Sequence, residues 1–325
     1  MKAWICETPT GIEALQWREL PTPEPKAGEV RVAVRAASLN FPDLLVVQGK
    51  YQFKPTPPFT PGAEFSGTID AVGDGVTHLK VGDAVAAMGV SGGFTTHAIV
   101  NASQALALPP GFDLEDGAAF AFTYGTSHHA LMDRAALKAG ETVLVLGAAG
   151  GVGSAAVQIA KAAGARVIAA ASSDEKCARC VLMGADATIN YSTQNLRDTL
   201  KTLTDGKGPD VIYDPVGDAI AEAAFRSIAW RGRYLVVGFA GGAIPALPFN
   251  LALLKGASIV GVFWGDFTRR EPKAFAASMA ELAKWYAKGL VKPVIDSKLP
   301  MSELPRALTR MGSRQVVGKL LLIND

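Results

Sequence analysis

Hydrophobic and polar positions change their spacing near residue 120 of this 325-residue chain. Before that point short stretches alternate, as in residues 29–39 (EVRVAVRAASL), where valines and arginines take turns. A period of two is typical of a strand with one buried face. Residues 67–76 and 81–89 follow, and each is interrupted by Gly-Asp turn signals. The first 120 residues are therefore predicted to be mostly β.

The middle of the chain alternates apolar strands with helical segments. Residues 141–147 (ETVLVLG) and 166–172 (RVIAAAS) are predicted strands, and helices are predicted at 154–165 and 174–185. Further strands are predicted at 210–217, 232–239 and 257–264. Strands that alternate with helices indicate an α/β fold, with a doubly wound parallel sheet covered by helices.

The length of the chain predicts two domains. Strands before residue 120 need partners, so we expect the end of the chain to return to the first domain. That end holds a predicted helix around residues 272–289 and a terminal strand at 316–323. The predicted domains are 1–122 with 265–325, and 123–264.

Charge and cysteine content narrow the possible partners and location. Lysine and arginine total 32 against 30 acidic residues, which offers no electrostatic basis for binding nucleic acid or a membrane surface. Three cysteines cannot form a disulfide framework, and the N-terminus lacks the apolar core of a signal peptide. The uncharged residues 142–160 contain several glycines and fit a strand, turn and helix better than a membrane span. We expect a soluble, cytoplasmic protein.

Residues 146–153 (LGAAGGVG) resemble a phosphate-binding turn with one glycine missing. Gly150 and Gly153 fill the second and third places of the dinucleotide fingerprint G-x-G-x-x-G, and Ala148 takes the first. Backbone N–H groups and the helix dipole favour a pyrophosphate at such a turn. We expect Gly147 to ease the turn at Ala148. The alternative is that small residues merely pack the helix on the sheet.

The end of the second strand favours NADPH over NADH. An NAD enzyme places an acidic residue there, about 20 residues beyond the glycines, for the ribose 2′-hydroxyl. That position falls near Ala171, and Ser172, Ser173 and Lys176 follow. Hydroxyls and an ammonium suit a 2′-phosphate. A serine helix cap with an exposed lysine is the alternative. Asp174, three residues after Ala171, could also be the acidic residue of an NAD enzyme.

These motifs, with residues 35–51 (RAASLNFPDLLVVQGKY), 61–76 (PGAEFSGTIDAVGDGV) and 317–323 (VGKLLLI), resemble the medium-chain dehydrogenase/reductase superfamily. The similarity is to its zinc-free NADPH:quinone oxidoreductase branch, the ζ-crystallin-like family. The resemblance implies a Rossmann domain and a GroES-like, partly open β-barrel catalytic domain built from both chain ends. It also implies a cleft between these domains and a homodimer or homotetramer.

Zinc enzymes share this scaffold, but their ligands are absent here. Their catalytic cysteine and histidine would fall at Asn40 and Ala63, and neither side chain suits zinc. Cys177 and Cys180 lie on a predicted helix without a second pair. The histidines that lack metal-binding spacing are His78, His97, His128 and His129. We expect no metal.

Short-chain dehydrogenases, another class of dinucleotide-binding enzymes, use a Tyr-x-x-x-Lys pair for catalysis. This pair does not occur in the chain.

A reductase without a metal suits an acceptor that is already electron-poor. Quinones and α,β-unsaturated carbonyls spread the arriving charge onto an oxygen, which the protein need only hydrogen-bond. The resemblance places Asn40 as a donor to that oxygen or to the nicotinamide carboxamide, Tyr51 as a hydrogen-bond or proton donor, and Asp43 as an orienting group. Each also has a local alternative as a turn, packing or cap residue. Leu45 and Val47 replace a tyrosine and an arginine of some relatives, which makes the pocket more apolar.

The resemblance assigns further residues to the cofactor. Thr126 is expected near the nicotinamide ribose or pyrophosphate, and Lys176, Tyr191 and Arg314 around the 2′-phosphate. The predicted cofactor residues are Asn40, Thr126, Ala149, Gly150, Gly151, Val152, Gly153, Ser172, Ser173, Lys176, Tyr191, Gly238, Phe239, Val262, Phe263, Trp264 and Arg314.

The sequence thus predicts an NADPH-dependent reductase that transfers hydride to a quinone or another conjugated carbonyl. A 2-enoyl thioester (enoyl-CoA) reductase is an alternative within the enzymes. A weakly catalytic NADPH-binding protein with a structural or RNA-associated role is the alternative of another class, and the near-neutral charge argues against binding RNA.

Overall fold

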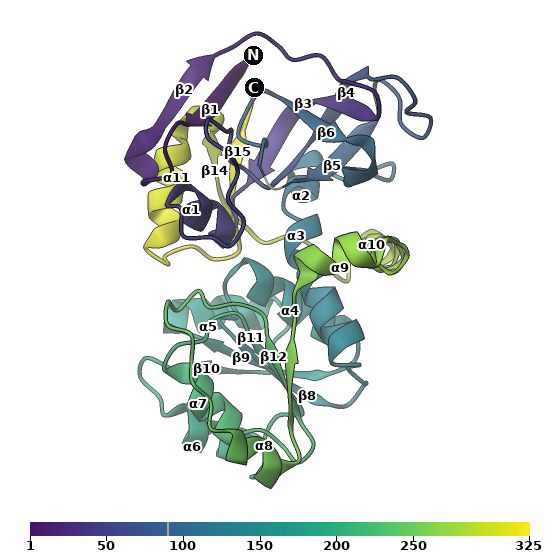
Figure 1. Cartoon of the computed structure of the whole chain (residues 1–325). Helices are drawn as coiled ribbons and strands as arrows, with labels where there is room; N and C mark the ends of the chain where they lie inside the picture. Colours follow the sequence, from purple (N-terminus) through teal and green to yellow (C-terminus); the bar gives the residue numbers. More distant parts are fainter. Residues whose placement is uncertain (90) are drawn as a thin grey trace. The chain divides into compact units, whose positions relative to one another are not determined.

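The computed structural model describes residues 1–89 and 91–325. These described residues divide into two compact units (Figure 1). Unit 1 contains Met1–Phe122 and Pro293–Asp325, and unit 2 contains Thr123–Lys292. Unit 1 therefore takes in both ends of the chain, and unit 2 is inserted between its two segments.

Unit 2 is built around a parallel sheet with the strand order β10-β9-β8-β11-β12-β13. This is the order of a doubly wound fold, in which β8 starts one half of the sheet and β11 starts the other. The carboxyl ends of β8 and β11 therefore lie side by side where the order reverses. The strands are β8 (Thr142–Leu146), β9 (Arg166–Ala171), β10 (Ala187–Asn190), β11 (Val211–Asp214), β12 (Arg233–Val236) and β13 (Ser258–Gly261). The helices are α3 (Ala121–His128), which starts before the boundary and continues into a π-helix (His129–Arg134), α4 (Gly151–Ala162), α5 (Asp174–Leu182), α6 (Leu196–Leu203), α7 (Ile220–Arg226), α8 (Phe249–Lys255), α9 (Trp264–Arg270) and α10 (Pro272–Ala287).

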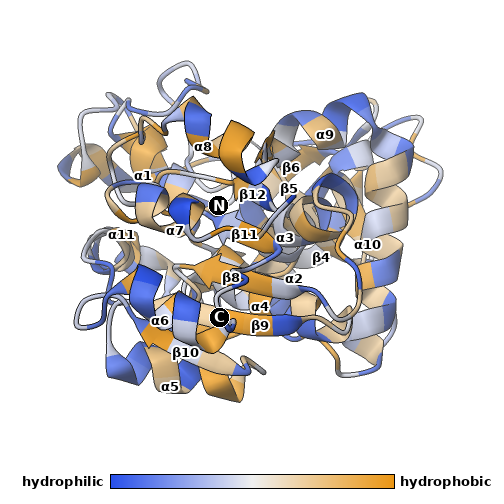
Figure 2. Cartoon of the chain, turned by 90° about the horizontal axis from the view of Figure 1, so that it is seen from below, coloured by the Kyte–Doolittle hydropathy of each residue, from blue (hydrophilic) through white to orange (hydrophobic). Residues whose placement is uncertain are grey.

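The central strands of unit 2 are apolar along almost their whole length. Strands β8 and β9 carry hydrophobic colours in Figure 2, and nearly all their side chains are buried. A strand buried on both faces needs such an uninterrupted apolar run. The uncharged residues 142–160 form β8, the turn and most of α4. No helix in the part of the chain that the structure describes is long and apolar enough to cross a membrane.

The second domain boundary differs from the predicted one. Residues 265–292 were assigned to the first domain, but they belong to unit 2. Helix α10 is held there by His128 of α3, whose ring nitrogens lie 2.8 Å from Ser278 Oγ and 3.1 Å from Glu281 Oε2. The prediction was wrong because only the strands after Pro293 need partners in unit 1. An amphipathic helix instead packs wherever it meets a suitable apolar surface.

Unit 1 is a mainly antiparallel sheet with the strand order β14-β15-β3-β4-β5-β7, and β6 pairs with β3 beside this path. Strands β14 and β15 are parallel to one another, and both come from the end of the chain. The strands are β1 (Lys2–Cys6), β2 (Leu15–Glu19), β3 (Glu29–Ser38), β4 (Glu64–Val72), β5 (Ala84–Met88), β6 (His97–Asn101), β7 (Ala105–Ala107), β14 (Ile295–Pro300) and β15 (Lys319–Ile323). The helices are α1 (Phe41–Val47), α2 (Leu114–Ala118) and α11 (Leu304–Gly312), with 3-10 turns at Ile12–Ala14, Ala102–Gln104 and Met301–Glu303.

Strand β3 organises unit 1 because it pairs along both of its edges. Its first half pairs with β6, its last residues pair with β15, and β4 runs along the other edge. The register against β4 shifts between Val34 and Ala36. Such an irregularity bends a strand and increases its twist, so one strand can serve two partners in turn.

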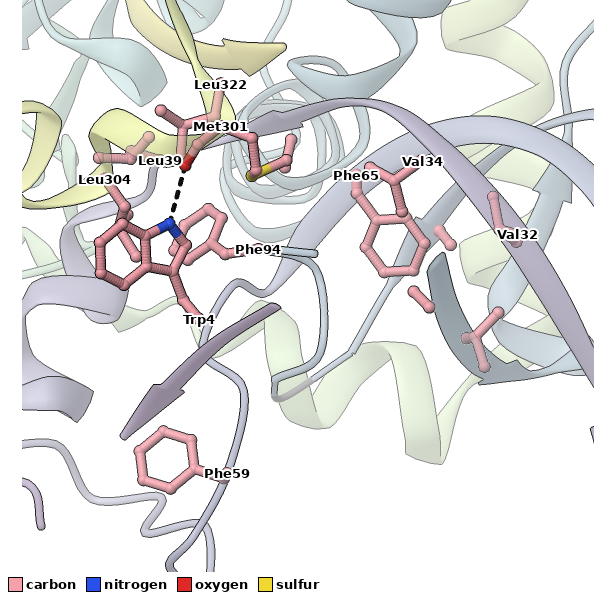
Figure 3. Packing of buried hydrophobic residues seen from close by; sticks show 14 of the residues in the cluster. Trp4, Val32, Val34, Leu39, Phe59, Phe65, Phe94, Met301, Leu304 and Leu322 are labelled. Carbon is pink, nitrogen blue, oxygen red and sulfur yellow. Dashed lines mark hydrogen bonds between the residues drawn. The ribbon is translucent and has the colours of Figure 1, made fainter. Parts of the chain in front are cut away.

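The two ends of the chain share one core in unit 1 (Figure 3). Trp4 of β1 packs with Phe94, Leu304 and Leu322, which come from distant parts of the sequence. The indole Nε1 of Trp4 donates to the carbonyl oxygen of Met301 at 2.8 Å. This bond satisfies a buried polar group and joins the start of the chain to its last segment.

Candidate cofactor site and buried polar cluster

The turn between β8 and α4 starts at Gly147, one residue before the place of the missing glycine. Gly147 has φ +58°, a left-handed conformation that side chains rarely adopt. A Cβ there would also lie 2.7 Å from Val216 Cγ2. Ala148 donates its N–H to the carbonyl oxygen of Ala170 on β9 at 3.1 Å. The tight turn therefore falls on Gly147, and this explains why alanine is tolerated at position 148.

Gly153 lets helix α4 approach the turn closely. A Cβ on Gly153 would lie 2.2 Å from the carbonyl oxygen of Gly147 and 2.8 Å from Ala148 Cα, which are backbone atoms. Gly150 is the N-cap residue of α4, and within the described residues no side chain caps this 12-residue helix. Uncapped N–H groups at a helix start bind anions such as phosphate.

Ser127 joins helix α3 to the start of α4. Its Oγ donates to the carbonyl oxygen of Val152 at 2.8 Å, and the hydroxyl of Tyr213 on β11 lies 2.9 Å from the same Oγ. The predicted cofactor residue Thr126 directly precedes Ser127 and is buried. The structure thus brings the helix of Thr126 to the glycine turn. Ser127 and Tyr213 were not predicted from the sequence, because only the tertiary contact distinguishes them from their neighbours.

Asp214, the last residue of β11, shapes the loop beside the glycine turn. Its Oδ1 accepts from the N–H groups of Val216 at 2.7 Å and Gly217 at 2.8 Å, and its Oδ2 accepts from the hydroxyl of Tyr234. Burial raises the pKa of Asp214, and the hydrogen bond from Tyr234 opposes that rise. Val216 packs against Gly147, so this loop supports the turn. Asp214 was not predicted from the sequence, since an Asp-Pro pair after a strand is also an ordinary turn signal.

The end of β9 carries the predicted 2′-phosphate residues. Lys176 Nζ lies 3.3 Å from Ser172 Oγ, so an ammonium and a hydroxyl share this strand end. Ser173 is the N-cap of α5 and accepts from the N–H of Lys176 at 3.2 Å, so the capping alternative holds for Ser173. Ser192 Oγ donates to the carbonyl oxygen of Ser172 at 2.9 Å, which holds the segment after Tyr191 beside it. Ser192 was not among the predicted residues.

Asp174 lies in the first turn of α5 rather than at the strand end. Its Oδ1 accepts from Asn190 Nδ2 at 2.7 Å. Acidic residues in the first turn of a helix are stabilised by the helix dipole. Asp174 therefore has a structural explanation, and the strand end itself has the hydroxyl of Ser172 and no acidic residue.

Gly238 and Phe239 follow β12 and contact the Asp214 loop. Gly238 donates its N–H to the backbone carbonyl oxygen of Asp214 at 3.3 Å. Phe239 packs against Gly217 so closely that a Cβ on Gly217 would lie 2.8 Å from the Phe239 ring. The predicted residues after β12 thus belong to the same edge of the sheet as the glycine turn.

The predicted cofactor residues after β13 differ in how far their side chains are buried. Trp264 is buried and packs edge-to-face on Phe275 of α10, with ring centroids 6.0 Å apart. A Cβ on Gly125 of α3 would lie 2.6 Å from the Trp264 ring. Phe263 is exposed, and Val262 is buried. The packing role of Trp264 is therefore visible in the structure, and its predicted contact with the cofactor stays a prediction.

The predicted catalytic residues lie in unit 1, where the sheet register gathers polar side chains. Ser38 at the end of β3 is opposite Glu64 on β4 and opposite Leu321 on β15. Lys319 precedes Leu321 by two residues and so lies on the same face of β15. Helix α1 begins just beyond Ser38. The side chains gathered here are exposed by 5% or less, and we refer to them as the buried polar cluster: Ser38, Asn40, Asp43, Glu64 and Lys319.

Glu64 and Lys319 form the charged centre of the buried polar cluster. Lys319 Nζ lies 3.4 Å from Glu64 Oε2 and 2.6 Å from Asn40 Oδ1, and it donates to the carbonyl oxygen of Leu39 at 2.9 Å. Glu64 Oε2 also accepts from Ser38 Oγ at 2.6 Å and from Asn40 Nδ2 at 3.1 Å. Burial lowers the pKa of Lys319, and the nearby Glu64 carboxylate opposes this. Buried charges persist where they are paired and hydrogen-bonded in this way.

Asp43 links the start of α1 to the segment before β4 by hydrogen bonds. Its Oδ2 accepts from the N–H of Asn40 at 2.7 Å, and its Oδ1 accepts from the N–H of Ala63 at 3.1 Å. Burial raises the pKa of Asp43 to about 7, against these two hydrogen bonds and the charge of Lys319. Burial and the charge of Asp43 raise the pKa of Tyr51, so its phenol keeps its proton. The structure thus brings Asn40 and Asp43 together, with Tyr51 within the electrostatic reach of Asp43.

Glu64 and Lys319 were not predicted as parts of this site. Each is a charged residue at the start of a strand and next to apolar residues, within AEFSG and GKLLLI. Charged residues are rarely buried unless they are paired, which is the signal that could have found them. Their pairing spans 255 positions of the chain, so only the sheet register reveals it.

The side chains around Asn40 do not suit a metal ion. Ala63 has no donor atom, and Asn40 Oδ1 already faces the Lys319 ammonium at 2.6 Å. Among the described residues, no three His, Cys, Asp or Glu side chains come together as a metal site. Cys177 and Cys180 are free and buried on α5, and burial raises the pKa of Cys180 to about 12. That shift favours the neutral thiol over the thiolate that metals bind.

Arg314 belongs to a different unit from the other residues predicted to hold the 2′-phosphate. It belongs to unit 1, whereas Ser172, Lys176 and Tyr191 belong to unit 2. Arg314 follows α11 with φ +58°. Its predicted role at the phosphate stays a prediction.

Known proteins match this chain in both units. The alcohol dehydrogenase GroES-like domain family matches residues 26–110, and the zinc-binding dehydrogenase family matches residues 151–284. The quinone oxidoreductase-like protein 2 of Bos taurus is 37% identical, over 99% of this chain and 96% of that protein. The chain belongs to the quinone oxidoreductase-like family of the medium-chain dehydrogenase/reductase superfamily. It is therefore an oxidoreductase, as the sequence analysis predicted.

Solved structures agree with this family. The Escherichia coli quinone oxidoreductase complexed with NADPH has a TM-score of 0.92 and 29% identity, with 100% of both chains covered. The CurK enoyl reductase has a TM-score of 0.89 and 25% identity, covering 99% of this chain and 98% of that one. These matches confirm the predicted fold, a Rossmann sheet combined with a GroES-like, partly open β-barrel domain.

Proposed function

We propose that this oxidoreductase uses NADPH to transfer hydride to a quinone or another α,β-unsaturated carbonyl, without zinc. The observation that carries the proposal is the hydroxyl of Ser172 and the ammonium of Lys176 at the end of β9, next in the sheet to the strand that leads into the glycine turn. The relative complexed with NADPH supports the same cofactor.

The residues of unit 2 fit a dinucleotide with a 2′-phosphate. A Cβ on Gly150 would meet only the carbonyl oxygen of Gly147, at 3.3 Å, among the described atoms within 4 Å, so a phosphate can approach the start of α4. The N–H groups at that start would hold the pyrophosphate. Ser172 and Lys176 would hold the 2′-phosphate, with Tyr191 beside them. When bound, NADPH supplies a hydride from its reduced nicotinamide.

The remaining predicted cofactor residues are supported by contacts at the same edge of the sheet or by the family resemblance. Thr126 is favoured by the bond from Ser127 to the first turn of α4. Gly238 and Phe239 are favoured by their contacts with the Asp214 loop at the same sheet edge. We retain Val262, Phe263, Trp264 and Arg314 as proposed contacts from the family resemblance.

Unit 1 supplies polar groups for the acceptor. Asn40 Nδ2 is an N–H donor in a buried setting, where hydrogen bonds to a developing negative charge are strong. Tyr51 keeps its proton, so it can donate a hydrogen bond to the acceptor oxygen or transfer the proton to it. Asp43 is occupied by the N–H groups of Asn40 and Ala63, so its role is to orient Asn40.

We propose a reaction without zinc because neither residue at the expected ligand positions is suited to bind it. Asn40 Oδ1 is engaged by Lys319, and Ala63 offers no ligand atom. A quinone or enone needs less polarisation than an alcohol, because conjugation spreads the charge that arrives with the hydride. Hydrogen bonds from Asn40 and Tyr51 would then serve in place of a Lewis acid.

The decisive experiment follows NADPH and NADH oxidation with a panel of quinones, enones and enoyl-CoA thioesters. We expect turnover with NADPH and a quinone or enone, and weaker turnover with NADH. Replacing Lys176 by alanine should raise the KM for NADPH about 10-fold or more, because a charge-assisted bond to phosphate is lost. The matched control is Lys201→Ala on the exposed face of α6, which should leave the KM unchanged. Binding of NADPH without turnover of any acceptor would refute the enzyme proposal and favour a non-catalytic role.

An enoyl thioester reductase is the second candidate, favoured by the structural similarity to the CurK enoyl reductase. Both reactions deliver hydride to a conjugated carbonyl system. The same panel separates them, because a reductase of this class would turn over the enoyl-CoA thioester faster than any quinone.

We also propose that the protein is a homodimer formed through unit 2. Strand β13 lies at the edge of the parallel sheet, and Ile259 on it is partly exposed. Helix α8, which precedes β13, exposes Phe249, Leu253 and Leu254. Exposed apolar side chains beside an unpaired strand edge are typical of an association surface. A homotetramer would need a further surface.

A further inference from the structure

Lys319 has an unusually complete set of partners for a buried lysine. Three oxygen atoms surround its Nζ: Asn40 Oδ1 at 2.6 Å, the carbonyl oxygen of Leu39 at 2.9 Å and Glu64 Oε2 at 3.4 Å. Three acceptors match the three N–H donors of an ammonium, which has no acceptor of its own. The geometry therefore indicates a charged lysine in the interior of unit 1.

This ammonium and the Glu64 carboxylate allow the Asn40 amide a single orientation. The amide oxygen faces Lys319, and the amide nitrogen donates to Glu64 Oε2 at 3.1 Å. The flipped amide would set an NH₂ group against the ammonium and an oxygen against the carboxylate. Both contacts would be repulsive, and in a buried setting such repulsion is strong.

Asn40 and Asp43 also form a capping box at the start of α1, in which the amide nitrogen of Asn40 takes no part. Asp43 donates its N–H to the backbone carbonyl oxygen of Asn40 at 2.9 Å, and Asp43 Oδ2 receives the N–H of Asn40 at 2.7 Å. The backbone of Asn40 and the side chain of Asp43 thus close the start of α1. Nδ2 of Asn40 keeps a second hydrogen, for which no described residue offers an acceptor.

We propose that Lys319 is a positioning residue of the reductase, which acts through Asn40. Its ammonium holds the amide oxygen, so that the second Nδ2 hydrogen is presented to the carbonyl oxygen of the acceptor. A buried cation on the amide oxygen also polarises the amide and makes its N–H a better donor. The inference rests on the proposed function, because it assigns the amide hydrogen to the acceptor of that reaction.

A purely structural role is the competing explanation. Lys319 joins the last strand of the chain to β4 through Glu64 and to the end of β3 through Leu39. On that view, any change that restores stability would also restore activity. The test must therefore separate the orientation of the amide from the stability of the fold.

The first measurement does not depend on activity. In protein labelled with ¹⁵N-asparagine, the side-chain amide signals of Asn40 are assigned by their loss in Asn40→Asp. We expect Lys319→Met to shift these signals, because methionine is of similar length but cannot hold the amide oxygen. Lys298→Met is the matched control: it removes an exposed lysine paired with Glu115 from the neighbouring strand β14 and should leave the signals unchanged. Unchanged signals in Lys319→Met would overturn the inference.

The second measurement is turnover with NADPH and a quinone. We expect Lys319→Met to lower kcat about 10- to 100-fold and to leave the affinity for NADPH unchanged. This loss in kcat is no larger than the loss seen when a direct donor to an oxyanion is removed. Removing only one charge leaves Glu64 unpaired and can unfold the protein. The double variant Lys319→Met/Glu64→Gln removes both charges and should recover the melting temperature without recovering kcat.

The outcomes distinguish this inference from the proposed function. A double variant that recovers both stability and kcat would show a structural role and overturn the inference, while the proposed function stands. A normal kcat in Lys319→Met has the same consequence. A wild-type protein that reduces no acceptor would overturn the proposed function, and with it the assignment of the amide hydrogen. Shifted Asn40 signals together with a kcat that stays low in the stable double variant would support the inference.

Discussion

Replacing Gly153 by alanine tests whether the close approach of α4 to the turn holds the cofactor site together. The added Cβ would lie 2.2 Å from the carbonyl oxygen of Gly147 and 2.8 Å from Ala148 Cα. Ordinary contacts begin at 3.4 Å, so the helix and the turn must separate by about 1 Å. Neither atom belongs to a side chain that could rotate away.

The expected cost follows from this overlap. Forcing an extra carbon into packed structure costs about 1–3 kcal/mol, and the lower unfolded-state entropy of alanine offsets about 0.4–1 kcal/mol of that. For a unit of this size, each kcal/mol lowers the melting temperature by roughly 2–4 °C. Because both clashing atoms belong to the backbone, we take the upper end of the cost, which leaves a net loss of about 2–2.6 kcal/mol. We therefore expect the melting temperature to fall by about 4–10 °C. The displaced N–H groups at the start of α4 should also weaken NADPH binding, by about 10-fold for each charge-assisted hydrogen bond that is lost.

Thermal unfolding followed by circular dichroism and a fluorescence titration with NADPH measure the two effects. Gly150→Ala is the matched control, because Gly150 has φ −79° and a Cβ there would meet only the carbonyl oxygen of Gly147, at 3.3 Å, among the described atoms within 4 Å. A well-tolerated change alters stability by about 0.5 kcal/mol or less, so the melting temperature of Gly150→Ala should stay within about 2 °C of the wild type. Its NADPH binding should still weaken, because the added methyl group takes the phosphate's place. A Gly153→Ala variant with the stability and affinity of the wild type would refute the packing argument. Equal destabilisation by both variants would refute it as well.

Two further predictions concern the other parts of the molecule. Because burial raises the pKa of Asp43 from 3.8 to about 7, the folded protein keeps a proton that the unfolded chain loses between these values. The free energy of unfolding should therefore fall as the pH rises through that window, by up to about 1.4 kcal/mol per pH unit. Urea unfolding at pH 5 and pH 7 measures this fall, which should be smaller in Asp43→Asn than in the wild type. An identical fall in both proteins would contradict the raised pKa of Asp43. Ile259→Lys places a charge on the edge strand β13 and should convert the proposed dimer into a monomer in light scattering, whereas an unchanged mass would exclude that surface.

Much of unit 2 could be predicted from the sequence because its signals are local. The apolar strands β8 and β9, the glycines of the turn and the hydroxyls of Ser172 and Ser173 all lie within one stretch of chain, where spacing maps directly onto structure. The boundary at residue 265 was wrong for the opposite reason. Whether the helix at 272–287 packs on one unit or the other depends on surfaces that no local pattern describes.

The sequence by itself determined which residue types stand at the chemically important positions. It placed glycine at 150 and 153, asparagine rather than cysteine at 40, and alanine rather than histidine at 63, and these choices follow from the motifs alone. Only the tertiary structure decided what Asn40 does, because its partners Glu64 and Lys319 lie 24 and 279 positions away. Strand pairing brings these charges together, and burial makes their pairing obligatory, since an unpaired charge in the interior costs several kcal/mol. The orientation of one amide is therefore set by the register of three strands, β3, β4 and β15.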